Sequence, residues 1–260
     1  MFAPSLVRAA LHITLLWAVA GQVAAGLGAA LPYGGEVAFV SDRDGDEDIY
    51  LLDVERGALH NLTRADGSDR QPLWSPDGAR LAFLSDRDGY WNVFVMSATG
   101  GERRRITDNR RSYRNVTWSP DGRRLAFSSL YLESGQIVRS NIHIADVDMR
   151  QSYALPTPRG RMVYAPIWSA DGQRIQFNTQ LSDSLGIYHM RVDGSDLRAF
   201  AADDTIEWAQ SKPRVGPDDM TFVIYFTGGY TDVCVVNEAK RFRRCLTGGI
   251  GHNIEPVWRP

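Results

Sequence analysis

Short apolar segments alternate with polar turns from residue 36 to residue 258, and the same order of segments returns several times. A segment that ends in Trp is followed by a polar turn and a short apolar strand, as in Trp74-Ser75-Pro76-Asp77-Gly78 before Leu81-Ala82-Phe83. Pro at the second position and Gly at the fourth are typical of a tight turn. Each copy therefore predicts a strand, a turn and a second strand.

The copies recur at a regular distance along the chain. Further copies begin at Trp118 and Trp168, a degenerate one begins at Val215, and a last one includes Trp258. Their first positions are 44, 50, 47 and 43 residues apart. A period in the forties is typical of a propeller, because one hairpin cannot bury its own apolar face whereas several packed together can.

Two more strands are expected in each unit. A loop such as Ser85-Asp86-Arg87-Asp88-Gly89 leads to a third strand at 92–96 and a fourth near Arg105-Ile106-Thr107. The sequence thus predicts an all-β fold, a five-bladed β-propeller of four-stranded blades. The expected blades are 36–64 with 254–258, 70–108, 113–157, 163–200 and 208–247. The C-terminal strand should join the first blade and close the ring, which removes exposed sheet edges.

The first 30 residues have a different pattern. Arg8 precedes an apolar run from Ala9 to Ala20, and small residues suited to cleavage follow. We interpret residues 1–30 as a secretory signal peptide, or alternatively as an N-terminal membrane anchor, ahead of a propeller at 36–260. We therefore expect a periplasmic or secreted protein, with membrane contact only through this segment if it is not cleaved.

Charge and cysteine content narrow the possible partners. The chain has 29 basic and 31 acidic residues, and this balance argues against nucleic acid as a partner. Two cysteines, Cys234 and Cys245, fall on neighbouring strands of one expected hairpin, at the places of Phe94 and Arg105. Because exported proteins meet oxidising conditions, we expect a disulfide, and two buried thiols are the alternative.

Catalytic and metal-binding motifs are weak in this sequence. There is no Gly-x-Ser-x-Gly motif, and the histidines lie far apart without ligand spacing, so no catalytic residue, metal or cofactor is expected. The acidic stretch 42–48 raises a calcium hypothesis, but the second copy replaces acids there with Tyr90 and Trp91. Asp69, Glu207 and Glu255 precede first strands and leave a glycoside-cleaving or carbohydrate-binding propeller as the alternative function.

The loops between second and third strands and the connections between blades should share one face, the loop face. These loops are longer and less repetitive than the Ser-Pro-Asp-Gly turns, and function tends to lie on variable loops held by a rigid scaffold. Exposed aromatic and Arg side chains favour partner binding. The predicted partner-binding residues are Arg70, Gln71, Tyr90, Trp91, Tyr113, Arg114, Asn115, Tyr164, Trp208, Lys212, His252, Asn253 and Glu255.

The repeat resembles that of the TolB-type β-propeller family, most specifically at 74–83, 85–89 and 118–127. The resemblance implies an exported, non-catalytic propeller that binds other proteins; in TolB the propeller engages a peptidoglycan-associated lipoprotein. TolB differs in having six blades and a preceding α/β domain. We therefore expect a monomeric interaction module of the cell envelope whose partner is an envelope protein or lipoprotein.

Overall fold

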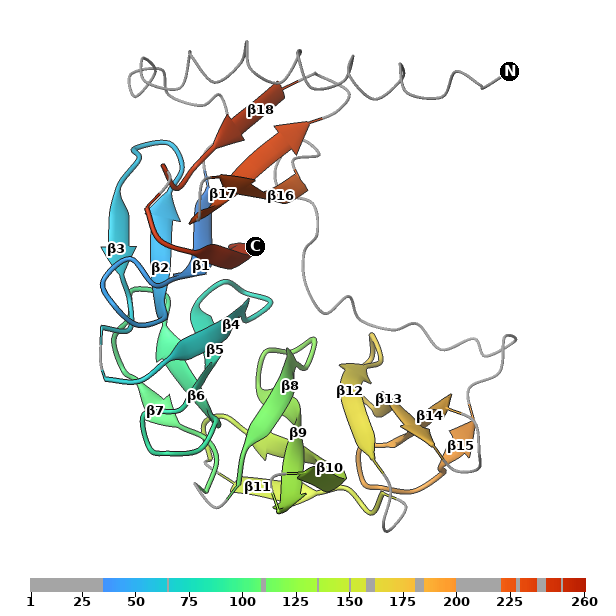
Figure 1. Ribbon diagram of the computed structural model, residues 1–260. Coiled ribbons are helices and arrows are strands. Elements are labelled where there is room, and N and C mark those ends of the chain that lie inside the picture. The colour runs from blue at the N-terminus through green and yellow to red at the C-terminus, as the bar shows by residue number, and fades with distance from the viewer. Residues whose placement is uncertain are drawn as a thin grey trace, which may run out of the picture.

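The computed structural model is an arc of antiparallel β-sheets (Figure 1). It describes residues 35–64, 66–108, 111–134, 136–149, 151–157, 162–180, 185–199, 221–227, 230–237, 242–248 and 250–260. These residues form five sheets, four of four strands and one of three. The five-bladed, all-β propeller predicted from the repeats is confirmed. No helix among the described residues has the length and apolar character needed to cross a membrane.

The sheets follow the expected blades. The first contains β19 (Asn253–Trp258), β1 (Glu36–Ser41), β2 (Asp48–Asp53) and β3 (Leu59–Asn61). The second contains β4 (Asp69–Trp74), β5 (Arg80–Ser85), β6 (Asn92–Ser97) and β7 (Arg104–Arg105). The third contains β8 (Tyr113–Trp118), β9 (Arg124–Glu133), β10 (Gln136–Asp146) and β11 (Gln151–Ala154).

The last two sheets differ in how much of each is described. The fourth contains β12 (Val163–Trp168), β13 (Arg174–Gln180), β14 (Leu185–Arg191) and β15 (Arg198–Ala199). The fifth contains β16 (Thr221–Thr227), β17 (Tyr230–Asn237) and β18 (Phe242–Cys245). Its expected first strand falls within residues 200–220, which lie outside the described residues.

The Ser-Pro-Asp-Gly turns form as their sequence predicts. The Gly78 N–H donates to the Ser75 carbonyl at 2.8 Å, and Gly122 and Gly172 repeat this bond at 2.9 Å. Gly78 has a φ of 65°, a left-handed conformation that glycine adopts without steric cost. The Ser75 hydroxyl donates to the Asp77 carboxylate at 2.5 Å and receives the Arg80 N–H at 2.9 Å. The turn is therefore held by side chains as well as by the backbone.

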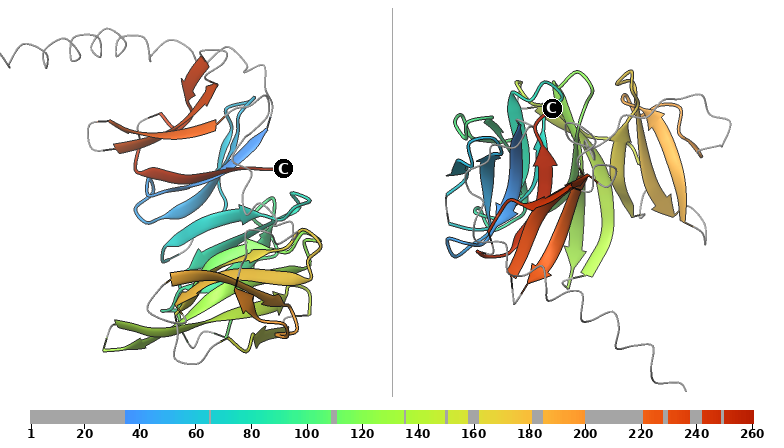
Figure 2. Two further views of the ribbon diagram at one scale, coloured as in Figure 1. Left: turned by 90° about the vertical axis from the view of Figure 1, so that its right-hand side faces the viewer. Right: turned by 90° about the horizontal axis from the view of Figure 1, so that it is seen from above.

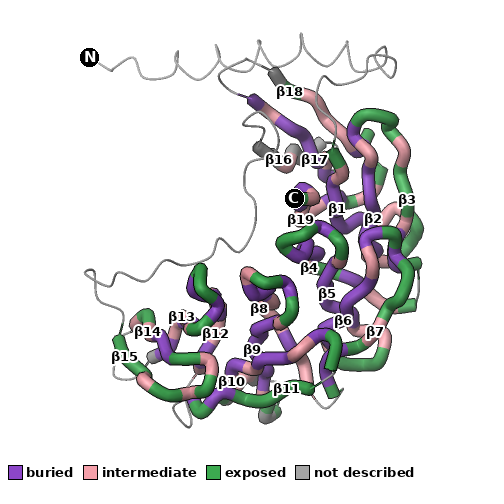
Figure 3. Tube along the Cα trace, turned by 180° about the vertical axis from the view of Figure 1, so that it is seen from behind, coloured by how far each residue is buried: buried purple, intermediate pink, exposed green. Residues whose placement is uncertain are grey.

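The tryptophans before these turns pack between sheets. Trp118 is 5% exposed, and its Nε1–H donates to the Leu73 carbonyl of the second sheet at 2.9 Å. The Arg80 guanidinium lies 5.5 Å from the Trp118 ring and donates to the Gly122 carbonyl. Figure 3 shows the buried residues concentrated along the inner and middle strands, where neighbouring sheets face each other. Burial of these large rings between sheets contributes to the apolar contact from blade to blade.

The arginine contact to the next sheet recurs around the arc. Arg124 lies 4.8 Å from the Trp168 ring and donates to the Gly172 carbonyl at 3.0 Å. Arg259 lies 5.3 Å from the Trp74 ring and donates to the Gly78 carbonyl at 2.7 Å. Each pair combines a cation–π contact with a charged hydrogen bond, so each joins two sheets at the turn face.

The C-terminal strand completes the first sheet, as predicted. β19 pairs antiparallel with β1, with Trp258 opposite Val37 and Asn253 opposite Ser41. β19 also contacts β4 on one side and β16 and β17 on the other, so it lies between the second and fifth sheets. Figure 2 shows this strand from two further directions. Residues 200–220, which connect the fourth and fifth sheets along the chain, lie outside the described residues.

Candidate functional site

The loop face lies opposite the Ser-Pro-Asp-Gly turns. In each sheet the first strand runs toward that turn and the second strand returns, so the turns from second to third strands lie at the other end. Exposed apolar side chains occur beside these turns in four sheets. They are Tyr90, Leu132, Ile187 and Tyr230, which are 45%, 47%, 42% and 50% exposed. Four blades thus each contribute an exposed apolar side chain beside the turns of one face.

The first strands share an irregularity near this face. Gln71, Asn115, Ala165 and Glu255 each lie three residues before a Trp and have φ values of 53°, 56°, 53° and 54°. The pairing register shifts at each of these places, which marks a β-bulge. Non-glycine residues in this conformation cost of order 1 kcal/mol or more, and such strain often lies near functional sites. The repeat pattern in the sequence did not predict these bulges.

Two of the bulge residues also connect neighbouring first strands. The Gln71 N–H donates to the Glu255 carboxylate at 2.5 Å, which joins β4 to β19. Glu255 therefore already binds a backbone donor of the next blade. Lys212, which holds the same place relative to Val215, lies outside the described residues.

The arginine of the Ser-Asp-Arg-Asp-Gly loop secures the start of the first strand. Arg87 donates to both carboxylate oxygens of Asp69 at 3.0 and 2.8 Å and to the Ser85 hydroxyl at 2.8 Å. In the first sheet Arg43 binds Ser41 and Asn253 in the same way. The arginine of each of these two loops thus joins its loop to the first strand of the same sheet.

Two of the three acids considered for glycoside cleavage are engaged within the protein. The Asp69 side chain is fully buried and paired with Arg87. Burial raises its pKa, although the bonds to Ser85 and Arg87 oppose that rise. Glu255 receives the Gln71 N–H, and Glu207 lies outside the described residues. A buried, paired carboxylate is poorly placed to act as one of two acids flanking a sugar bond.

The acidic loop considered for calcium also uses its carboxylates internally. Asp44 accepts the Tyr50 hydroxyl at 2.5 Å. Asp48 accepts bonds from Asn61 at 2.7 Å and Thr63 at 3.0 Å. These bonds hold β2 and β3 together near the loop. In the described part of the chain no group of three or more His, Cys, Asp or Glu side chains is placed to hold a metal ion.

A polar cluster lies under the loop face of the third sheet. The Tyr113 hydroxyl donates to Asp108 at 2.5 Å, and burial together with this bond raises the Tyr113 pKa. His143 stacks on Phe127 at 5.8 Å between ring centroids and lies 3.0 Å from the Ser129 hydroxyl. Burial, with a smaller contribution from Arg111, lowers the His143 pKa to about 4. His143 is therefore a neutral structural residue at pH 7.

The predicted partner-binding residues do not all reach the surface. Arg70, Tyr90 and His252 are exposed, whereas Tyr113 and Asn253 are buried at 4% and 0% exposure. The half-buried ones are Gln71, Trp91, Arg114, Asn115, Tyr164 and Glu255. Trp208 and Lys212 lie outside the described residues. Tyr113 and Asn253 can influence a partner only by positioning their neighbours, and direct binding by the others stays a prediction.

Other loop-face residues were not singled out from the sequence. Leu132 and Ile187 are exposed there, and Arg111 and Arg139 contact the Tyr131 ring. A signal for Leu132 and Arg139 was available, because strand-forming apolar residues, Leu130-Tyr131-Leu132 and Ile137-Val138, continue beyond the point where the other blades turn. Arg111 lies in a connection without periodicity, so only the structure identifies it.

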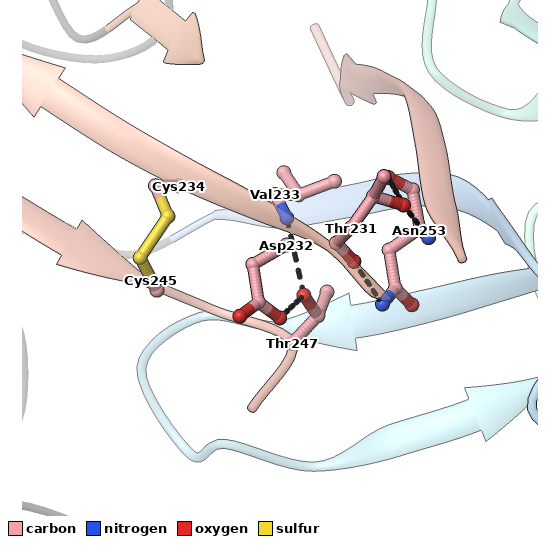
Figure 4. The surroundings of a disulfide bond; sticks show 7 residues. All are labelled: Thr231, Asp232, Val233, Cys234, Cys245, Thr247 and Asn253. Carbon is pink, nitrogen blue, oxygen red and sulfur yellow. Dashed lines mark hydrogen bonds between the residues drawn. A yellow bond between two sulfur atoms is a disulfide. The ribbon is translucent and has the colours of Figure 1, made fainter. Parts of the chain in front are cut away.

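The disulfide is present and lies on the fifth sheet. Cys234 on β17 pairs directly with Cys245 on β18, as Phe94 on β6 pairs with Arg105 on β7. Figure 4 shows the disulfide beside two other ties, in which Thr247 binds Asp232 and Thr231 binds Asn253 of β19. The alignment of hairpins therefore predicted the partner strands and the bond.

Comparisons with solved structures identify similar folds. TolB from Acinetobacter baumannii superimposes with a TM-score of 0.61 at 16% identity, over 87% of this chain and 67% of that one. Hydrazine synthase from Kuenenia stuttgartiensis gives 0.60 at 12% identity, over 88% and 47%. Oligogalacturonate lyase from Vibrio parahaemolyticus gives 0.54 at 16% identity, over 81% and 61%. At these identities the likeness concerns the fold alone.

Comparison with sequence families is more specific. No curated protein sequence matches this chain. Residues 22–155, just over half of the chain, match the family model of the TolB β-propeller domain. With the Trp-Ser-Pro-Asp-Gly repeats and the five antiparallel sheets, this match shows that the chain belongs to the TolB β-propeller (PD40) family.

Proposed function

We propose that this chain is an exported, non-catalytic propeller whose loop face binds a protein of the cell envelope. In this proposal residues 1–30 direct export, residues 36–260 form the binding domain, and the protein acts as a monomer in the periplasm or outside the cell. Membership of the TolB propeller family supports the envelope setting. The partner is an envelope protein or lipoprotein.

The observation that carries the proposal is the exposed apolar surface of the loop face. Tyr90, Leu132, Ile187 and Tyr230 come from different blades but border the same face. Arginine and aromatic side chains accompany them; Arg70, for example, lies 5.2 Å from the Trp91 ring. Tryptophan, tyrosine and arginine side chains provide much of the binding energy in protein interfaces, and the core of an interface is apolar. A sugar-cleaving site would need two accessible carboxylates, and Asp69 is buried beneath Arg87.

A capture experiment tests this proposal. The full chain is immobilised and exposed to envelope extract, beside the variant Tyr90→Ser/Leu132→Ser, which removes two exposed loop-face side chains. We expect a protein that the wild type retains and the variant loses, because the apolar contacts no longer form. The matched control is Met149→Ser/Leu197→Ser, which removes two exposed apolar side chains away from these turns.

The control decides how the result is interpreted. A partner lost equally from both variants would contradict binding at the loop face. No captured protein, together with cleavage or retention of an oligosaccharide in a glycan array, would favour the carbohydrate-active alternative. All variants are compared by circular dichroism first, so that a loss of binding is not a loss of fold.

A further inference from the structure

The third blade carries the longest hairpin of the loop face. β9 has 10 residues and β10 has 11, whereas the second and third strands of the other sheets have 6 to 8. The two strands pair from Asp146 opposite Arg124 to Gln136 opposite Glu133. The additional pairs lie at the loop-face end, since the other end begins directly after the Ser-Pro-Asp-Gly turn.

Two arginines hold one aromatic ring near the tip of this hairpin. The Arg139 Cζ lies 4.1 Å from the Tyr131 ring centroid, and the Arg111 Cζ lies 4.7 Å from it. Arg111 also donates from Nη1 to the Tyr131 hydroxyl. Arg139 is the cross-strand partner of Tyr131 and is exposed, and Leu132 beside them is 47% exposed. Cation–π contacts and the hydrogen bond restrict these side chains before any partner arrives.

Arg139 is exposed and Arg111 is half-buried at this hairpin. Among the described residues neither Arg111 nor Arg139 forms an ion pair with a carboxylate. Other arginines of the loop face do: Arg70 pairs with Glu47, Arg87 with Asp69 and Arg105 with Asp88. The hairpin is therefore a place on this face where two positive charges share one ring, with the nearby Asp108 carboxylate accepting the Tyr113 hydroxyl.

We propose that this hairpin docks an acidic segment of the partner protein, with carboxylates on Arg111 and Arg139 and an apolar side chain against Leu132. The inference rests on the proposed function and adds the chemistry of the partner. Guanidinium groups bind carboxylates through paired, charge-assisted hydrogen bonds. Opposite charge across an interface also speeds association and excludes basic partners.

Binding of synthetic peptides to the full chain tests the docking chemistry. The probes are two fluorescent peptides of alternating residues, one of Glu and Leu and the other of Lys and Leu, and a single-stranded oligonucleotide of similar charge. The acidic peptide should bind at least tenfold more tightly than the basic one, and its affinity should fall as salt rises. Arg139→Glu should weaken that binding at least tenfold, whereas Arg139→Lys should weaken it less.

The control variant carries the same charge change on the opposite face. Arg123→Glu lies in an exposed Ser-Pro-Asp-Gly turn, so it alters the net charge equally and should leave the affinity unchanged. Equal losses in Arg139→Glu and Arg123→Glu would overturn the proposal, because the effect would then come from net charge. Equal affinity for both peptides, or tighter binding of the oligonucleotide than of the acidic peptide, would also overturn it.

Capture from envelope extract separates this inference from the proposed function. A partner retained by the wild type and equally by Arg139→Glu would leave the interaction function intact and contradict docking at the hairpin. A partner lost from Arg139→Glu but retained by Arg123→Glu would support both. Absence of any partner, with the peptide preference intact, would contradict the proposed function alone.

Discussion

Single residues in this propeller depart from their usual conformation or ionisation, and the cause in each case is the position they occupy in a blade. The first-strand residues Gln71, Asn115, Ala165 and Glu255 have left-handed backbone conformations although none is glycine. His143 lies inside a polar cluster that excludes its charged form. Both features have a measurable effect on stability.

The bulge position predicts a stabilising substitution. Ala165 has a φ of 53°, a conformation that costs a non-glycine residue about 1–2 kcal/mol. Ala165→Gly should raise the free energy of unfolding by up to about 1 kcal/mol, since part of the gain is offset by greater freedom of the unfolded chain. Urea unfolding measures it. Ala126→Gly is the control, because Ala126 is fully buried on β9 and removal of its methyl group should lower the free energy of unfolding. An equal decrease in the free energy of unfolding in both variants would contradict the prediction.

The half-buried His143 predicts a dependence of stability on pH. The pKa of His143 is lowered from 6.5 to about 4 in the folded protein, and the unfolded chain keeps the ordinary value. Between pH 6.5 and pH 4 the unfolded chain therefore binds more protons than the folded one. The stabilisation is complete above pH 6.5 and is lost as pH falls through this window, by up to about 3 kcal/mol.

Two histidine variants measure this contribution. His143→Gln keeps a hydrogen-bonding group near Ser129 but cannot take up the proton, so its free energy of unfolding should change less between pH 7 and pH 4.5 than that of the wild type. His252→Gln, a change at an exposed histidine, retains His143 and should behave like the wild type. The same pH dependence in His143→Gln as in the wild type would show that another group is responsible.

At the level of elements, the hairpins differ in what holds them together. In the first two blades an arginine of the loop lies over aromatic rings, as Arg43 does 4.8 Å from Tyr50 and Arg87 does 5.2 Å from Phe94. The fifth blade has a short turn between β16 and β17 instead of that loop. There a disulfide between Cys234 and Cys245 joins the third and fourth strands. The third blade extends its hairpin and adds Arg111 and Arg139 around Tyr131.

The disulfide predicts a loss of stability on reduction. It closes a loop with a sequence separation of 11 residues, and removing such a bond costs about 2–3 kcal/mol, mainly through the unfolded chain. Cys234→Ala/Cys245→Ala should unfold at correspondingly lower urea concentration than the oxidised wild type. Reduced wild type should resemble the variant. An unchanged midpoint in both would show that β17 and β18 are held by their other bonds alone.

At the scale of the whole molecule, blades are joined by repeated contacts at the turn face and bind partners, in our proposal, at the opposite face. Arg124 and Arg259 each lie over the Trp of the next sheet and bind a glycine carbonyl there. The position of Trp168 is taken in the fifth copy by Val215. Arg174, which corresponds to Arg124, instead bonds to Asp196 and His189 of its own sheet. Blades four and five therefore cannot form the same arginine–tryptophan contact.

The contact of Arg124 with Trp168 predicts that lysine at this position cannot replace arginine without a loss of stability. Arg124→Lys loses the planar group that lies over Trp168 and binds Gly172, so the free energy of unfolding should fall by about 1–2 kcal/mol. Arg123→Lys, at the exposed neighbouring position, should change it by less than about 0.5 kcal/mol. Thermal unfolding of the two variants measures the difference. Equal stability would show that the guanidinium contact adds nothing to apolar packing of the tryptophan.

Much of the fold followed from local sequence. The turn residues, the Trp before each turn and the alternating strands predicted five blades, their boundaries and the pairing of Cys234 with Cys245, because these features act within one blade and recur in the next. The addition of the C-terminal strand to the first sheet also followed, since the repeat order requires it. The loop face was predicted for the same reason, by counting strands.

The properties of individual loop-face residues depended on contacts between distant segments. Asp69 is buried because Arg87 covers it, Tyr113 is buried against Phe127 and His143, and Glu255 binds a backbone group of the next blade. Repeat spacing places such residues at a face but does not say which side chains fill the space beneath it. The bulges and the arginine pair around Tyr131 likewise arise from packing across strands. Sequence periodicity thus decided the architecture, and tertiary packing decided which residues remain accessible to a partner.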